Sequence, residues 1–81
     1  MTFDMYTQPG CQPCLATERK AAKHGIEMNV TNIREDESAV AFLQELGYNG
    51  TPVVVIRDEG GEIVEHWTGF SPDRIAKYAA A

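Results

Sequence analysis

The chain has 81 residues, 43% of them hydrophobic, which suits one domain over residues 1–81 and is too short for two. Its net charge of −5 leaves few Lys and Arg to neutralise phosphates, so neither nucleic acid nor an anionic membrane is an expected partner. No apolar run approaches the roughly 20 residues that span a bilayer. The first residues also lack a basic and apolar leader, so we expect a cytoplasmic protein.

A strand is predicted over residues 3–7, where apolar side chains alternate with polar ones. The segment Gln8-Pro9-Gly10 interrupts this alternation, because proline and glycine favour turns. Strong helix formers then dominate residues 13–23, and Gly25 suits the position that follows a helix C-terminus. The chain is therefore expected to begin with a strand, a turn and a helix.

A second strand is predicted over residues 27–33, where the alternation returns. Its expected buried side chains are Met28, Val30 and Ile33. The acid-rich residues 34–38 precede a second helix that ends at Gly47, and acidic residues suit the positive end of a helix dipole. The apolar positions of this helix follow the i, i+3, i+4, i+7 spacing of an amphipathic helix: Ala39, Phe42, Leu43 and Leu46.

The continuous β-branched run at residues 53–56 predicts a strand that is buried on both faces. A turn at residues 58–61 leads into a returning strand at residues 62–67. Pro72 suits the first position of a last helix, with Ser71 as its N-cap. The expected buried residues of that helix are Ile75 and either Tyr78 or Ala79.

The predicted element order is β-α-β-α-β-β-α, which places the chain in the α/β class. A helical crossover joins the first two strands, so they are expected to be parallel, whereas the last two form an antiparallel hairpin. The sequence therefore predicts a four-stranded mixed sheet flanked by three helices.

The two cysteines, Cys11 and Cys14, stand three positions apart where the first strand gives way to the first helix. A disulfide across so short a loop would stabilise the fold little, because the entropic gain grows with loop length. The unpaired N–H groups and the dipole of a helix start favour a thiolate, which is the attacking form, and Pro13 suits a first helical turn. Cys11 is therefore the predicted nucleophile, and Cys14, further into the helix and more buried, is the predicted resolving cysteine.

Two other interpretations of the cysteine pair stay open at this point. A zinc site would need a second pair of ligands, and the candidates His24 and His66 lie on separate predicted elements. The thiols could also be inert members of a binding module without enzyme activity. Alkylation across pH distinguishes these cases, because a reactive thiolate accelerates the reaction below the ordinary range of a free cysteine.

The dipeptide Thr51-Pro52 stands directly before the buried strand. A cis proline here would bring the backbone next to the helix that begins at the cysteine pair. A trans proline at the first position of a strand is the alternative, since most X–Pro bonds are trans.

Three blocks of this chain, which together extend over nearly its whole length, resemble the NrdH-redoxins. These proteins are glutaredoxin-like in sequence and thioredoxin-like in behaviour. The blocks are Tyr6-Thr7-x-x-x-Cys11-x-x-Cys14-x-Ala16-Thr17-x-Arg19, Thr51-Pro52-Val53-Val54 and Trp67-Thr68-Gly69-Phe70-Ser71-Pro72-Asp73. The resemblance implies a thioredoxin fold with a cis peptide before Pro52, and thiol–disulfide oxidoreductase activity.

The resemblance also implies partners. The reduced protein would donate electrons to a class Ib ribonucleotide reductase, and thioredoxin reductase with NADPH would re-reduce it. No bound cofactor is expected besides the redox-active cysteine pair, and we expect a monomer. The residues that the resemblance places at the partner-binding surface are Gln12, Pro13, Thr51, Pro52, Trp67, Gly69 and Phe70. For Trp67 the alternative is packing, the more frequent role of an aromatic residue at a strand end.

Two departures from the family pattern concern the active site. The residues between the cysteines are Gln12 and Pro13, as in the C-x-P-C of thioredoxins, which favours an electron donor over an oxidant. Ser71 stands where the family has an arginine, and Thr68 where it has a serine. These changes remove or reroute hydrogen bonds beside the active site.

The alternative functions are a glutathione-dependent glutaredoxin and a general protein disulfide reductase. Glutaredoxins usually place a lysine before the active-site loop, but position 8 is Gln8, and no Lys or Arg lies between Met1 and Cys14. The bulky Phe70 also stands where a glutathione-binding loop would be open. A glutathione carboxylate would therefore lack a charge-assisted hydrogen bond, which is worth about 1.5–3 kcal/mol.

Overall fold

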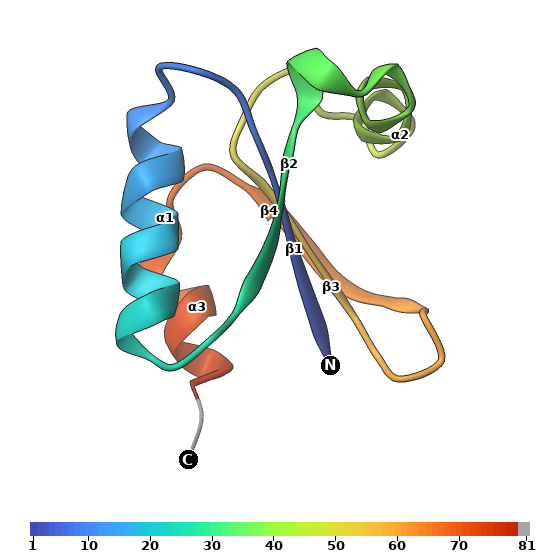
Figure 1. Ribbon diagram of the computed structural model, residues 1–81. Coiled ribbons are helices and arrows are strands. Elements are labelled where there is room, and N and C mark those ends of the chain that lie inside the picture. The colour runs from blue at the N-terminus through green and yellow to red at the C-terminus, as the bar shows by residue number, and fades with distance from the viewer. Residues whose placement is uncertain (80–81) are drawn as a thin grey trace.

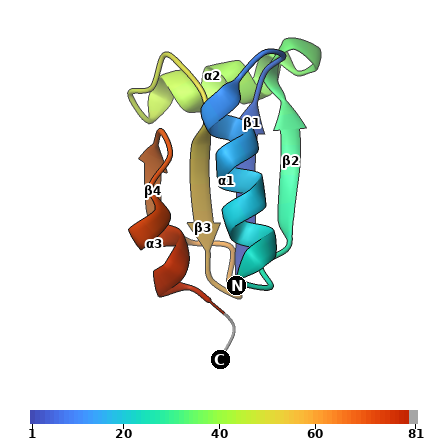
Figure 2. The same cartoon turned by 90° about the vertical axis from the view of Figure 1, so that its left-hand side faces the viewer.

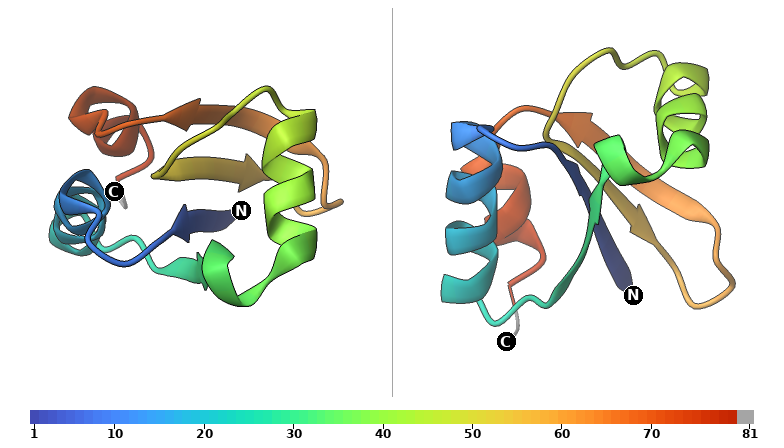
Figure 3. Two further views of the ribbon diagram at one scale, coloured as in Figure 1. Left: turned by 90° about the horizontal axis from the view of Figure 1, so that it is seen from above. Right: turned by 45° about the horizontal axis from the view of Figure 1, so that its top comes forward.

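Four strands form one twisted sheet in the computed structural model, which describes residues 1–79 (Figure 1). The helices α1 and α3 lie on one side of the sheet and α2 lies on the other, as the view from above makes clear (Figure 3). The elements are β1 (Thr2–Thr7), α1 (Gln12–Lys23), β2 (Met28–Asn32), the 3-10 helix η1 (Ile33–Glu35), α2 (Glu37–Glu45), β3 (Val53–Arg57), β4 (Ile63–Thr68) and α3 (Pro72–Lys77).

The strand order in the sheet is β2-β1-β3-β4. β1 and β2 are parallel, and β3 is antiparallel to both β1 and β4. The predicted thioredoxin-type fold, with a mixed sheet, a parallel first pair and a terminal hairpin, is confirmed. Figure 2 shows α1 and α3 packed side by side over one face of this sheet, with α3 next to β4.

Gly25 ends α1 as predicted, because it adopts a positive φ of 71° that side chains with a Cβ rarely accept. The N–H of Ile26 donates to the carbonyl of Ala21 at 2.9 Å, and the N–H of Gly25 donates to the carbonyl of Ala22 at 3.0 Å. Both Ala21 and Ile26 are buried in the core. The turn therefore satisfies two helix carbonyls and returns the chain to the sheet.

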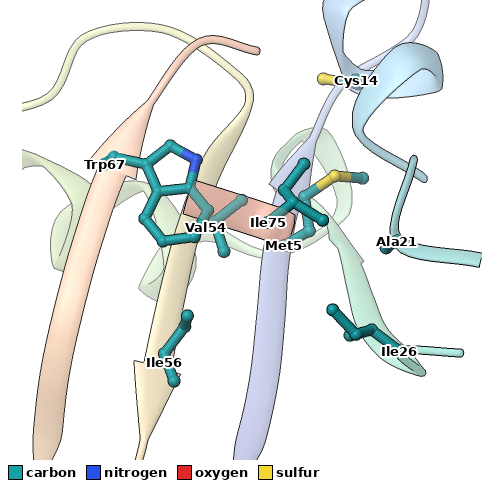
Figure 4. Close-up of a cluster of buried hydrophobic side chains, with 8 residues drawn as sticks. All are labelled: Met5, Cys14, Ala21, Ile26, Val54, Ile56, Trp67 and Ile75. Carbon is teal, nitrogen blue, oxygen red and sulfur yellow. The ribbon is translucent and has the colours of Figure 1, made fainter. Parts of the chain in front are cut away.

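The hydrophobic core lies on both faces of β3, whose residues Val53 to Ile56 are all fully buried, as predicted. One cluster fills the space between the sheet and α1 and α3 (Figure 4): Met5, Cys14, Ala21, Ile26, Val54, Ile56, Trp67 and Ile75. The second cluster lies under α2: Leu43, Val53 and Val55. Successive β3 residues alternate between the two clusters, because side chains along a strand point to opposite faces.

The prediction that Val30 is buried is wrong, since its exposed fraction is 46%. β2 is an edge strand, so the cover over Val30 ends at the margin of the sheet. Ile26, which precedes the strand, is buried instead. Met28 and Ile33 are only partly buried, and Ile33 begins η1 rather than continuing the strand.

The last helix follows the prediction in its start and in one buried residue, whereas Tyr78 and Ala79, one of which the sequence predicts as buried, are both only partly buried. α3 begins at Pro72, and Ile75 is 1% exposed. Ser71 occupies the N-cap position, but its side chain makes no capping hydrogen bond. Across residues 1–79, no helix combines the length and the hydrophobicity that crossing a bilayer requires.

Candidate active site

Cys11 and Cys14 form a disulfide at the start of α1, with an S–S distance of 2.10 Å and a Cα–Cα distance of 5.2 Å. Cys11 is the N-cap residue, with extended backbone angles, and Pro13 lies in the first helical turn. The backbone N–H of Cys14 donates to Sγ of Cys11 at 3.2 Å. One of the free N–H groups of the helix start is thus directed at the sulfur of the first cysteine, as the sequence predicts.

The two cysteines differ in their access to solvent. Cys14 is 1% exposed and belongs to the core cluster between the sheet and α1. Cys11 is partly exposed. Cys11 also lines an open hollow of about 340 Å³, whose other lining residues are Gln8, Pro9, Gly10, Gln12, Pro13 and Thr51. A reactant that enters this hollow therefore meets Cys11 and not Cys14.

Thr17 lies one turn below the disulfide and is fully buried. Its hydroxyl donates to the carbonyl of Pro13 at 2.8 Å, which ties the second turn of α1 to the first. Reasoning from the sequence noted Thr17 only within a family block and assigned it no role. A buried threonine four residues after the proline of the active-site turn is the signal that could have indicated this bond, since threonine hydroxyls often bond to the carbonyl at i−4.

The peptide between Thr51 and Pro52 is cis, as the family resemblance implies. Pro52 is buried, and its carbonyl accepts hydrogen bonds from the N–H of Gly69 at 3.0 Å and from the hydroxyl of Thr68 at 2.9 Å. Thr68 therefore makes a bond that crosses 16 residues of sequence. The two loops that the sequence placed beside the cysteines are joined to each other at this carbonyl.

The strand register brings these segments to one end of the sheet. Tyr6 of β1 pairs with Val53 of β3, and Val53 pairs with Thr68 of β4. The β1–α1 loop, the α2–β3 loop and the β4–α3 loop therefore meet at the end where α1 begins (Figure 1). Thr51 borders the hollow beside Cys11, whereas Pro52 lies buried behind it.

The position of Trp67 corrects its predicted role as a partner-binding residue. Trp67 is 3% exposed and packs in the core cluster, so its ring has too little free surface for a contact with another protein. The packing interpretation describes its position. By contrast, Phe70 is 44% exposed, and Gly69 adopts a positive φ of 81° in the loop between them.

A charged network attaches α3 to β4 beside this loop. Glu65 accepts a hydrogen bond from the hydroxyl of Tyr78, and its carboxylate lies 2.9 Å from Nζ of Lys77 and 3.5 Å from Nε of Arg74. The hydrogen bond from Tyr78, followed by that from Lys77, lowers the pKa of Glu65. Burial, together with the hydrogen bond to Glu65, raises the pKa of Tyr78 to about 12. These contacts hold the helix that follows Phe70.

Comparison with known proteins agrees with this geometry. A family model described as Glutaredoxin matches residues 4–60. The glutaredoxin-like protein NrdH of Lactococcus lactis subsp. cremoris (strain MG1363) is 28% identical over 75 residues, which cover 93% of this chain and 96% of that protein. The gene 56 protein of Mycobacterium phage D29 is 27% identical over 71 residues, which cover 88% of this chain and 74% of that protein.

The solved structure of the glutaredoxin-like protein NrdH-redoxin from Escherichia coli superposes with a TM-score of 0.86. It is 30% identical, and the match covers 100% of this chain and 99% of that one. The chain belongs to the glutaredoxin family, among the NrdH-redoxins. The E. coli protein is described as having a thioredoxin-like activity profile.

As an NrdH-redoxin, the protein is a thiol–disulfide oxidoreductase, and its cysteine pair is placed as that activity requires. Within residues 1–79, no group of three or more His, Cys, Asp or Glu side chains is arranged to hold a metal ion. His66, one of the two histidines weighed as ligands, has its Nδ1 2.7 Å from the hydroxyl of Tyr48.

Proposed function

We propose that this NrdH-redoxin is a cytoplasmic, monomeric, single-domain dithiol electron donor to a class Ib ribonucleotide reductase. In this proposal thioredoxin reductase re-reduces the Cys11–Cys14 disulfide with electrons from NADPH. The observation that carries the proposal is the difference between the two cysteines: Cys11 lines an open hollow at a helix start, and Cys14 lies buried behind it. The likeness to the NrdH-redoxins supports this choice of partners.

The proposed cycle consists of two exchange steps. The thiolate of Cys11 attacks one sulfur of the substrate disulfide, a new S–S bond forms between Cys11 and that sulfur, and the other substrate sulfur leaves as a thiolate. Cys14 then attacks Sγ of Cys11 as a thiolate and releases the second substrate thiol. The substrate gains two electrons and two protons, and the Cys11–Cys14 disulfide that remains has lost them.

The backbone supplies positive potential at Cys11. No Lys or Arg lies between Met1 and Cys14, so no cationic side chain of that segment supports a thiolate. The N–H of Cys14, 3.2 Å from Sγ of Cys11, and the positive end of the α1 dipole favour the charged sulfur instead. We therefore propose Cys11 as the nucleophile and Cys14 as the resolving cysteine.

The surface around Cys11 favours an uncharged partner segment. The exposed apolar residues Leu15 and Phe70 are each 44% accessible, and they lie at the start of α1 and in the β4–α3 loop. We propose that the partner contacts Phe70 and the rim of the hollow, with Pro52 acting as support because it is buried. The rim residues assigned to this contact are Gln12, Pro13, Thr51 and Gly69.

Glutathione fits this surface poorly. Each of its carboxylates would need a cationic or well-directed N–H partner, and all seven residues that line the hollow are uncharged. The net charge of −5 also disfavours an anionic ligand. A protein disulfide that docks through apolar and backbone contacts meets neither difficulty, so we place protein partners ahead of glutathione.

Parallel NADPH-oxidation assays test the proposal. In one, the oxidised protein is mixed with thioredoxin reductase and a class Ib ribonucleotide reductase; in the other, with glutathione, glutathione reductase and a small disulfide. We expect rapid NADPH loss and deoxyribonucleotide formation in the first assay only. The Cys11→Ser variant is the control that reports the background rate. Activity confined to the glutathione assay would replace this proposal with a glutathione-dependent glutaredoxin.

A further inference from the structure

Three buried polar side-chain atoms in residues 1–79 have no hydrogen-bond partner: Nε2 of His24, Oγ1 of Thr51 and Nε1 of Trp67. Such atoms are uncommon in folded proteins, and each calls for an explanation. His24 is the C-cap of α1, at the far end of the helix from the cysteines. Thr51 borders the hollow beside Cys11. Trp67 is the one of the three that shares a core cluster with Cys14.

The indole N–H of Trp67 is closed off from bulk solvent. Trp67 is 3% exposed, and the guanidinium carbon of Arg74 lies 5.8 Å from the centroid of the indole ring. In Figure 4 the ring nitrogen lies on the edge of the indole nearer to the α1 start, and Sγ of Cys14 is directed from α1 toward the side of the cluster where Trp67 lies. The free N–H therefore lies in a core cluster whose fully buried cysteine sulfur is that of Cys14, whereas the partly exposed Cys11 packs against the edge of the same cluster.

The sulfur of Cys14 needs a hydrogen-bond donor when it is charged. To attack the mixed disulfide it must act as a thiolate, yet it is 1% exposed among apolar side chains, where burial disfavours a charged sulfur. Its own N–H points at Cys11 and not at its own sulfur. A buried thiolate needs a hydrogen-bond donor, and Trp67 has a donor with no acceptor.

We propose that the indole N–H of Trp67 donates a hydrogen bond to Sγ of Cys14 once the cysteine pair is reduced. The inference rests on the proposed dithiol–disulfide cycle and adds a residue to it. Reduction by a dithiol breaks the Cys11–Cys14 bond, transfers two electrons to the pair, leaves a thiol or thiolate on each cysteine and converts the reductant into its disulfide. The bound disulfide sulfur is a weak acceptor, and the freed thiolate is a strong one. Trp67 thereby stabilises the dithiol form and helps Cys14 to ionise.

The test measures the equilibrium between the protein and a buffer of reduced and oxidised dithiothreitol. Trp67→Phe removes the N–H and keeps an aromatic ring. We expect the ratio of dithiol to disulfide protein at fixed buffer composition to fall about tenfold, the size of a hydrogen bond to a charged group. In a Cys11→Ser background, the same change should move the ultraviolet titration of the Cys14 thiolate to higher pH. Replacing a residue with only a structural role would change neither the dithiol–disulfide equilibrium nor the titration of the Cys14 thiolate.

Two further variants keep the test decisive if Trp67→Phe unfolds. A synthetic chain with benzothienylalanine at position 67 replaces the N–H by sulfur and preserves the shape of the ring, so it should show the same tenfold shift. Tyr78→Phe keeps the ring but removes a hydroxyl that bonds to Glu65 and to neither cysteine, so it should leave the equilibrium unchanged. An unchanged equilibrium and titration in the position-67 variants would overturn this inference alone. A wild-type protein that does not exchange with dithiothreitol at all would overturn the proposed function as well.

Discussion

The two long helices begin with the same local structure but with different chemistry. At α1 the cap is Cys11, whose sulfur accepts from the N–H of Cys14 at 3.2 Å. At α2 the cap is Asp36, whose carboxylate accepts from the N–H groups of Ser38 and Ala39 at 3.0 and 3.2 Å. Each cap places an atom that can carry negative charge against the free N–H group of the residue three positions ahead.

Asp36 shows what such a helix start does to a titrating group. The hydrogen bond from the Ser38 hydroxyl, followed by that from the Ala39 N–H, lowers the pKa of Asp36. At α1 the cap accepts from the backbone N–H of Cys14 without such a hydroxyl, and the accepting atom is a sulfur that can also form a covalent bond. One helix start is therefore a permanent cap, whereas the other is a cap whose charge and bonding change with each redox cycle.

Exchanging the α1 cap should have the largest effect. Cys11→Ser keeps an oxygen that can accept from Cys14 but removes the nucleophile, so we expect disulfide reduction to fall to the rate without protein. Cys14→Ser should retain attack by Cys11 and accumulate a mixed disulfide with the partner, visible on non-reducing gels. Trapping by Cys11→Ser and not by Cys14→Ser would reverse the proposed roles.

The surroundings of the α1 start should matter for partner binding. Phe70→Ala removes an exposed aromatic ring beside the site, so we expect the KM for the partner protein to rise about tenfold with little change in kcat. Val64 on β4 is similarly exposed at 48% and provides a matched control, since Val64→Ala should leave both constants unchanged. Steady-state kinetics with thioredoxin reductase measure both variants, and equal effects would argue against a contact at Phe70.

Gly47, which follows α2, tests how much the backbone conformation at a helix end contributes to the free energy of unfolding. Gly47 has a φ of 93°, and a Cβ there would meet nothing within 4 Å, so Gly47→Ala tests conformation alone. We expect it to lower the free energy of unfolding by about 1 kcal/mol, because a Cβ disfavours positive φ. Gly50→Ala, also in open space but without a positive φ, should be nearly neutral in chemical denaturation.

Asp36→Asn should have the smallest effect, one that depends on pH. The folded-state pKa of Asp36 lies below its ordinary 3.8, so the charged cap contributes stability above that value and loses it as the pH falls through the folded pKa. Thermal unfolding should show the variant slightly less stable than wild type at neutral pH, and the difference should shrink in acid. Redox activity at neutral pH should be unchanged, and a variant that lost activity would contradict the separation of the two helix starts.

Most of the elements could be predicted from the sequence because their signals are local. Alternation, helix formers, Pro13, and the glycines after α1 and α2 act within a few residues, and the observed bounds lie close to the predicted ones. The cysteine pair at the start of a helix belongs to this class. The exposure of Val30 and the burial of Trp67 do not, because each depends on what the rest of the chain places over that side chain.

The amino-acid sequence by itself determined where strands, turns and helices lie and that Cys11 precedes a helix, since neighbouring residues set these preferences. Only the tertiary structure decided the order β2-β1-β3-β4 and the meeting of the Pro52 carbonyl with Thr68 and Gly69 beside the cysteines. It also decided that Trp67 packs inside with an unpartnered N–H. The physical reason is range: dihedral preferences act between neighbours, whereas burial and cross-strand hydrogen bonds join segments that meet only when the chain is folded.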